Sequence, residues 1–166
     1  MFVWLEDEVY GWRVFRLVIG FVLCSFVWAE ISFWFIFTLF QFQGSKYVPT
    51  VSILVWYFPL MLLGKAFLEE LIFRLPVSFL IRDIGYLDQR VFSFVLVWQI
   101  VFGLMHGGFL NIFVQGVLGL MLVAVYLKCG GAKGKTLKPL LVATFAHALY
   151  NGLIAVEMLL RGYNFF

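Results

Sequence analysis

The fold of this chain is decided by the stretch Phe67-Leu68-Glu69-Glu70-Leu71-Ile72-Phe73-Arg74. Two adjacent glutamates and an arginine interrupt a run of residues that is otherwise apolar. A carboxylate at membrane depth costs from about 2.5 kcal/mol to several times that, depending on its access to water and on its partners. The pair Glu69 and Glu70 therefore indicates a polar site inside an apolar bundle of helices.

The composition indicates an integral membrane protein. Of the 166 residues, 64% are hydrophobic, 20% are aromatic and only 13% are charged, whereas soluble domains carry about 25% charged residues. We therefore expect an all-α membrane helix bundle that forms a single transmembrane domain over residues 1–166, with the lipid bilayer as its surroundings. The net charge is only +3, and no basic run alternates with aromatic residues, so nucleic acid is not an expected partner.

Five apolar segments are each close to the roughly 20 residues that a helix needs to cross a bilayer. They run over about 14–40, 51–81, 91–106, 112–127 and 137–160. Polar or glycine-rich segments separate them, including the polar turn 41–49 and the break at Gly107-Gly108. The first or second segment is long enough to hold an additional membrane-embedded piece, which would make six spans. Pro59 and Pro76 predict kinks in the second.

The lysines and arginines predict the topology of five spans. Eight of them share the N-terminal side of the membrane: Arg13, Arg16, Arg82, Arg90, Lys128, Lys133, Lys135 and Lys138. Only Lys46 and Arg161 fall on the opposite side. Because basic residues concentrate in cytoplasmic loops, the N-terminus is expected in the cytoplasm.

This topology brings the polar residues of three helices to one depth. Counted from the nearest cytoplasmic loop at about 1.5 Å per residue, Glu70, His106, His147 and Asn151 lie about 14–24 Å into the membrane. His106 and His147 are the only histidines of the chain. Carboxylate and imidazole groups at one depth could bind a metal or another ion, relay protons, or activate water.

Activation of water for hydrolysis needs a base and donors for the oxyanion. A glutamate in apolar surroundings is a better proton acceptor than one in water, and a histidine can hold the same water molecule. His147 and Asn151 stand at i and i+4 on one helix face, where they could donate hydrogen bonds to an oxyanion. Glu70 and Arg74 have the same spacing, so Arg74 could orient Glu70 or neutralise its charge.

Three motifs follow one another in separate apolar segments. They are Glu-Glu-x-x-x-Arg (Glu69, Glu70, Arg74), Phe-x-x-x-His (Phe102, His106) and His-x-x-x-Asn (His147, Asn151). In order and spacing they resemble the CPBP family of intramembrane CAAX proteases and bacteriocin-processing enzymes, also called the Abi family. The resemblance covers about residues 60–155, which would form the protease core.

The resemblance implies a glutamic-type intramembrane endopeptidase. Glu69 would activate the water, with His106 as its partner, and His147 and Asn151 would stabilise the oxyanion. Glu70 and Arg74 would be supporting residues of the catalytic site. Phe102 would pack beside them or shape the substrate cleft.

A metal-free site is the preferred prediction, with no cofactor. Zinc is the alternative, because Glu69, Glu70, His106 and His147 could supply enough ligands. Neither histidine lies in an HExxH motif, however, and the carboxylates that usually accept a hydrogen bond from a zinc-binding histidine are not evident in the sequence.

The resemblance also implies the kind of substrate, a membrane-embedded or lipid-anchored peptide or protein. Eukaryotic relatives cleave prenylated CAAX peptides. A chain this short is similar to the prokaryotic branch, which implies a multi-pass protein of a prokaryotic inner or plasma membrane. Leader-peptide processing, bacteriocin self-immunity or removal of C-terminal sorting anchors would then be its role.

Two other functions stay open. One is a non-catalytic membrane protein that binds a partner, for example in immunity, on the same scaffold. The other is a proton- or ion-coupled transporter, which the lack of a visible internal repeat disfavours.

Several residues have simpler structural interpretations. Glu70 and Arg74 could form only a buried ion pair, and Lys65 could pair with Glu69 and weaken it as a base. Glu30 could face water, pair with Lys65, or lie near the cavity. Further expectations concern packing: Gly103 and Gly107 would allow close helix contact, and Gln99, Asn111 and Gln115 would form interhelical hydrogen bonds.

Overall fold

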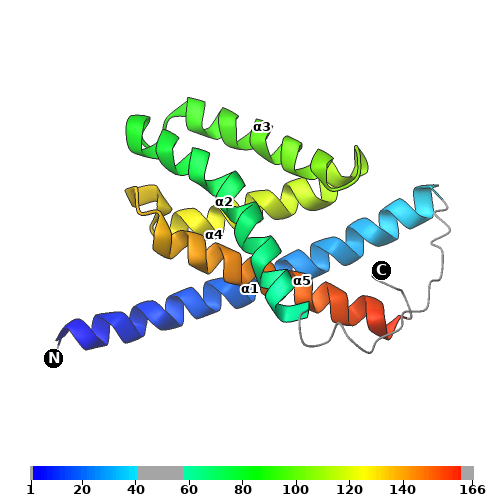
Figure 1. The fold of residues 1–166 in the computed structure, drawn as a ribbon, viewed down its shortest axis with the longest axis horizontal. Coiled ribbons are helices and arrows are strands. Elements are labelled where there is room, and N and C mark those ends of the chain that lie inside the picture. The colour runs from blue at the N-terminus through cyan, green and yellow to red at the C-terminus, as the bar shows by residue number, and fades with distance from the viewer. Residues whose placement is uncertain (1, 41–57, 162–166) are drawn as a thin grey trace.

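The computed structural model describes residues 2–40 and 58–161 of the chain. These residues form five α-helices and no strand (Figure 1): α1 (Phe2–Phe40), α2 (Phe58–Ile84), α3 (Gln89–Met105), α4 (Val117–Lys128) and α5 (Leu137–Leu160). A single π-helical turn, η1 (Ile112–Gly116), precedes α4, and a short 3-10 turn, η2 (Gly131–Lys133), precedes α5. The all-α prediction is therefore confirmed. The predicted turn 41–49, with Lys46, lies outside the described residues.

Local sequence signals explain where α3 begins and ends. Asp88 is its N-cap, and the carboxylate accepts a hydrogen bond of 2.8 Å from the backbone N–H of Arg90. The Arg90 guanidinium binds the same carboxylate at 3.0 Å, and these hydrogen bonds lower the pKa of Asp88 to about 2. The helix ends at the predicted glycine break, where Gly107 and Gly108 have φ angles of 113° and 116° that favour glycine.

Two of the described helices are long and apolar enough to cross a membrane by themselves. The stretches are Gly11–Ser32 in α1 and Leu137–Glu157 in α5. The apolar helices Gln89–Met105 and Ile112–Lys128 are shorter, and the 27-residue α2 carries the charged residues of the first motif. By length and composition, the structure thus offers two candidate spans, and the bundle of five spans stays a prediction.

Helix α5 is the centre of the fold, because it packs against α1, α2 and α4. On the other side of the molecule, α3 packs against α2, α4 and η1. Figure 1 shows α2 crossing α5, while the N-terminal turns of α1 project beyond the other helices. Three groups of buried side chains fill the contacts. One joins α1, α4 and α5 around Phe21 and Leu122, one joins α2, α3 and α4 around Val77 and Val95, and one joins α4 and α5 around Tyr126.

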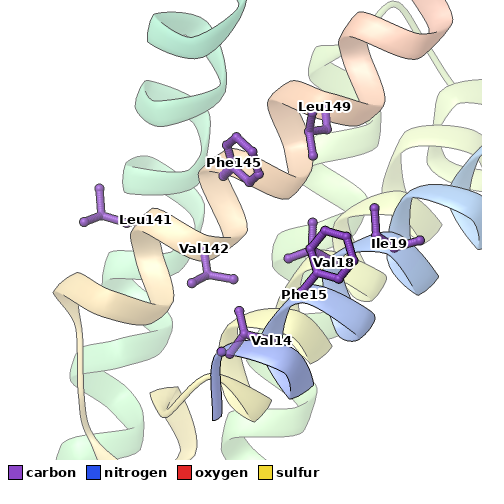
Figure 2. A pocket seen from close by; sticks show the side chains of 9 residues that line it. Val14, Phe15, Val18, Ile19, Leu141, Val142, Phe145 and Leu149 are labelled. Atoms are coloured by element: carbon purple, nitrogen blue, oxygen red, sulfur yellow. The ribbon is translucent and has the colours of Figure 1, made fainter. Parts of the chain in front are cut away.

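An apolar groove of about 380 Å³ lies between α1 and α5. Figure 2 shows Val14, Phe15, Val18 and Ile19 of α1 on one side, and Leu141, Val142, Phe145 and Leu149 of α5 on the other. His147 stands two residues from both Phe145 and Leu149, so its side chain leaves α5 on the opposite side. The groove and the polar residues of α5 therefore occupy different faces of this helix.

Candidate active site

Three helices bring the predicted polar residues together around one carboxylate oxygen. Oε2 of Glu69, on α2, lies 3.7 Å from Nε2 of His106, at the end of α3, and 3.6 Å from Nε2 of His147, on α5. Both distances exceed those of a direct hydrogen bond, and Oε2 has no hydrogen-bond partner among the described residues. A water molecule can bridge groups at this separation. The side chains of Glu69 and His106 are 17% and 21% exposed, although Oε2 of Glu69 is itself buried.

Glu70, next to Glu69 on α2, forms a fully buried ion pair with Arg74. Nε of Arg74 is 2.8 Å from Oε2 of Glu70, and both side chains are completely inaccessible. The Arg74 guanidinium also donates a hydrogen bond of 3.2 Å to the backbone carbonyl of Gly119 on α4. A buried charge needs such partners, because an unpaired one would lose its hydration without compensation.

The same carboxylate fixes the orientation of His147. Nδ1 of His147 lies 3.0 Å from Oε1 of Glu70. Because a carboxylate accepts hydrogen bonds, the Nδ1 atom carries the proton and donates it. The other ring nitrogen, Nε2, is thereby turned toward Glu69. Glu70 thus contacts both His147 and Arg74, as a supporting residue of the site would.

His106 is oriented in a similar way by its own helix. Its Nδ1 lies 2.7 Å from the backbone carbonyl of Phe102, which can only accept a hydrogen bond. The proton is therefore on Nδ1, and Nε2 faces Glu69. Both imidazoles present the same ring atom to one carboxylate oxygen.

Phe102 lies beneath the two histidines. Its ring is fully buried, with its centre 4.4 Å from the ring of His106 and 6.3 Å from that of His147. It also packs edge-on against Phe73 of α2 at 4.8 Å. Of the two roles predicted for Phe102, the packing role matches this position. Because its ring is fully buried, Phe102 could shape a substrate cleft only by positioning His106 and His147.

Asn151 follows His147 by one helical turn on α5, as the motif predicts, and is partly exposed. Within the described part of the chain, no hydrogen bond joins its amide to the other site residues. Its predicted role toward an oxyanion stays a prediction.

Two further charged residues were difficult to interpret from sequence. Lys65 lies 3.6 Å from Oε1 of Glu69, the oxygen other than the one that faces the histidines, and its side chain is 63% exposed. The predicted pair between Lys65 and Glu69 therefore exists. Glu30 pairs with Arg161 at 2.6 Å, and Arg161 also binds Glu157. Glu30 thus links α1 to the end of α5, and of the three alternatives stated for it, the pairing with Lys65 is wrong.

The residues described here include no group of three or more His, Cys, Asp or Glu side chains placed to hold one metal ion. The carboxylate partner that a zinc-binding histidine usually has, which is not evident in the sequence, is nevertheless present. Glu70 accepts a hydrogen bond from Nδ1 of His147, and a carboxylate–histidine pair of this type also orients metal ligands. Such a pair serves equally well to orient a histidine that binds water or substrate.

Asn111 and Gln99 differ from the interhelical hydrogen bonds predicted for them, and Gly119 makes a contact that the sequence did not predict. The carbonyl of Gly119 binds Arg74, a contact that no side-chain pattern could predict. Asn111 donates a hydrogen bond to the backbone carbonyl of His106, only five residues earlier in the chain, and not to another helix. Gln99 is buried, but neither atom of its amide has a hydrogen-bond partner in the residues described.

Comparison with known proteins identifies the family. No curated protein and no solved structure matches the chain. The family model for "Type II CAAX prenyl endopeptidase Rce1-like" matches residues 50–153, which is more than half of the chain and includes all three motifs. This match agrees with the CPBP resemblance of the sequence. The chain therefore belongs to the Rce1-like family of type II CAAX prenyl endopeptidases.

Proposed function

We propose that this protein is a glutamic-type intramembrane endopeptidase that hydrolyses a peptide bond of a membrane-embedded or lipid-anchored substrate. One observation carries the proposal. Oε2 of Glu69 is flanked by Nε2 of His106 and Nε2 of His147 at 3.7 and 3.6 Å, and it has no direct hydrogen-bond partner among the described residues. This is a suitable place for the water molecule that hydrolysis needs.

In the proposed reaction, a water molecule binds between Glu69 and His106. Its oxygen attacks the carbonyl carbon of the scissile peptide bond while one of its protons passes to Glu69. The product of this step is a tetrahedral intermediate with a negatively charged oxygen. Glu69 then gives the proton to the leaving amine, the C–N bond breaks, and the carboxylate is regenerated.

His147 would stabilise the negative oxygen of the intermediate. Because its Nδ1 proton is directed at Glu70, His147 donates through Nε2 only when the ring carries both protons. The carboxylate of Glu70 lies 3.0 Å from Nδ1 and holds the ring in this orientation. Donors that are fixed in advance in a water-poor site contribute strongly to such stabilisation, and Asn151, one turn further, would be the second donor.

The proposal places this chemistry inside a membrane. The apolar stretches of α1 and α5 support it, as does the excess of lysine and arginine on one side of the predicted topology. We propose a multi-pass protein of a prokaryotic plasma or inner membrane, with a cytoplasmic N-terminus. A substrate that reaches the site would itself be embedded in, or anchored to, the lipid.

The first test uses the full-length protein in lipid nanodiscs with a farnesylated CAAX peptide that fluoresces on cleavage. We expect the wild type, but not Glu69→Gln, to cleave it. Because the substrate class is broader than prenylated peptides, the membrane proteomes of cells with wild type and with His106→Ala should also be compared. We expect at least one membrane-anchored protein to change its terminus. A chain without activity in either experiment would instead be a binding protein on this scaffold.

A further inference from the structure

His106 lies directly after the last residue of α3, where the regular hydrogen bonds of the helix end. His106 is the C-cap, with φ −91° and ψ 16°, and the next two residues are glycines with positive φ. The carbonyl of a C-terminal residue has no partner within its helix. The N–H of His106 bonds to the carbonyl of Gly103 at 3.1 Å, so its own carbonyl is the backbone group that still needs a partner.

The side chain of Asn111 binds across the turn formed by residues 106–111, which we call the His106 corner. Nδ2 of Asn111 donates a hydrogen bond of 2.8 Å to the backbone carbonyl of His106. The Asn111 amide lies directly over the turn, because a Cβ atom added to Gly107 would come within 3.3 Å of Nδ2. Asn111 therefore spans the two glycines and ties His106 to the segment that follows.

That segment is itself held firmly. An added Cβ on Gly103 would lie only 2.7 Å from the carbonyl oxygen of Asn111 and 2.5 Å from Cα of Ile112, so the two backbones pack without any space between them. The π-helical turn that starts at Ile112 is anchored to α1 by a hydrogen bond of 3.0 Å from Nε1 of Trp28 to the carbonyl of Phe113. Single π turns are rare and often lie at functional sites.

We infer that Asn111 is a positioning residue for His106: it fixes the backbone of the histidine so that Nδ1 bonds to the Phe102 carbonyl and Nε2 faces Glu69. This inference rests on the proposed function only for its catalytic consequence. The geometry that it requires, the orientation of the His106 ring, can be measured without a substrate.

The chain is well suited to this measurement because it contains only two histidines. In protein labelled with ¹⁵N-histidine, the ring nitrogens of His106 and His147 give the only imidazole signals, and His106→Ala assigns them. We expect Asn111→Leu to shift the His106 signals away from the Nδ1–H form and to leave those of His147 unchanged. A purely structural role would change both rings or neither. Gln115→Leu, in the π turn that follows Asn111, is the control and should change neither ring.

The kinetic test uses the same variants. We expect Asn111→Leu to lower kcat by about 10- to 100-fold with little change in KM. Misplacing a reacting group by about 1 Å has effects of this size. Gln115→Leu should keep wild-type values. If Asn111→Leu does not fold, the isosteric Asn111→Asp, which lacks the donor, decides by the same criteria.

The outcomes separate this inference from the proposed function. If His106→Ala is inactive while Asn111→Leu keeps wild-type kcat and His106 signals, the positioning role is wrong. If His106→Ala keeps full activity, the proposed mechanism is wrong. The ring signals of Asn111→Leu still decide in that case whether Asn111 orients His106.

Discussion

Glu70 and His147, on α2 and α5, are joined by a hydrogen bond of 3.0 Å between Oε1 and Nδ1. The same carboxylate forms a completely buried ion pair with Arg74. Glu70 therefore has two tasks, since it neutralises a buried cation and also orients the imidazole that faces Glu69. The two tasks can be separated by mutation.

Removal of Glu70 alone should destabilise the protein strongly. Glu70→Ala leaves the Arg74 guanidinium buried without its counterion, and breaking a buried pair in this way is expected to lower the free energy of unfolding by about 3–5 kcal/mol. Thermal unfolding of the detergent-solubilised protein measures this loss. A variant as stable as the wild type would show that water or another group already compensates Arg74.

Replacement of both charges should restore the fold but not the function. In Glu70→Leu/Arg74→Met the buried cation is gone as well, so we expect most of the lost stability to return. Nδ1 of His147 still lacks its acceptor, and we expect cleavage to stay at least about 10-fold below wild type. An active double variant would contradict the orienting role of Glu70.

Glu69→Gln should affect activity without affecting the fold. The side chain keeps its size, and Oε2 has no hydrogen-bond partner to lose among the residues described. Loss of a general base is expected to lower kcat by about 10²–10⁴-fold. Cleavage assays and thermal unfolding of the same sample test this directly, and activity near the wild-type level would exclude Glu69 as the base.

Lys65 should matter little, although it pairs with the proposed base. It binds Oε1 of Glu69 at 3.6 Å from a largely exposed position, while the histidines face Oε2. Exposed pairs of this kind contribute about 0–1 kcal/mol, so Lys65→Met should change stability by no more than this and kcat by less than about fivefold. A loss comparable to that of Glu69→Gln would give Lys65 a part in the chemistry.

The sequence predicted the parts of this site that depend on spacing along one helix or on the order of motifs. Glu70 and Arg74 stand one turn apart, so their pairing follows from helix geometry. It could not predict contacts that depend on how helices cross. The Glu70–His147 bond joins α2 to α5, and the Gly119 carbonyl that binds Arg74 belongs to the backbone of α4. The role of Asn111 was also missed, because a glycine turn folds the chain back onto His106.

Chelation tests the choice between a metal-free and a zinc-dependent site. Because the described residues hold no group placed to bind one metal ion, we expect activity to persist after treatment with phenanthroline and EDTA. Elemental analysis of the purified protein should find less than one zinc per chain. Loss of activity that zinc restores would show instead that Glu69 and the histidines are metal ligands, and that the Glu70–His147 pair orients one of them.

Gly103→Ala should disturb the His106 corner. The added methyl group would meet the backbone of Ile112 at 2.5 Å and that of Asn111 at 2.7 Å. Backbone cannot give way as a flexible side chain can, so α3 and η1 must separate. We expect a loss of about 1–3 kcal/mol in stability and a larger fractional loss of activity than this destabilisation alone would cause, because His106 moves with the corner.

Gly64→Ala is the matched control for this prediction. Gly64 also lies within a helix, α2, but an added Cβ there has no atom within 4 Å. Alanine is favoured over glycine in a helix interior by about 0.5–1 kcal/mol, so the control should be slightly more stable and fully active. If Gly103→Ala behaved like Gly64→Ala in both unfolding and cleavage assays, the close contact between α3 and η1 would have no part in placing His106.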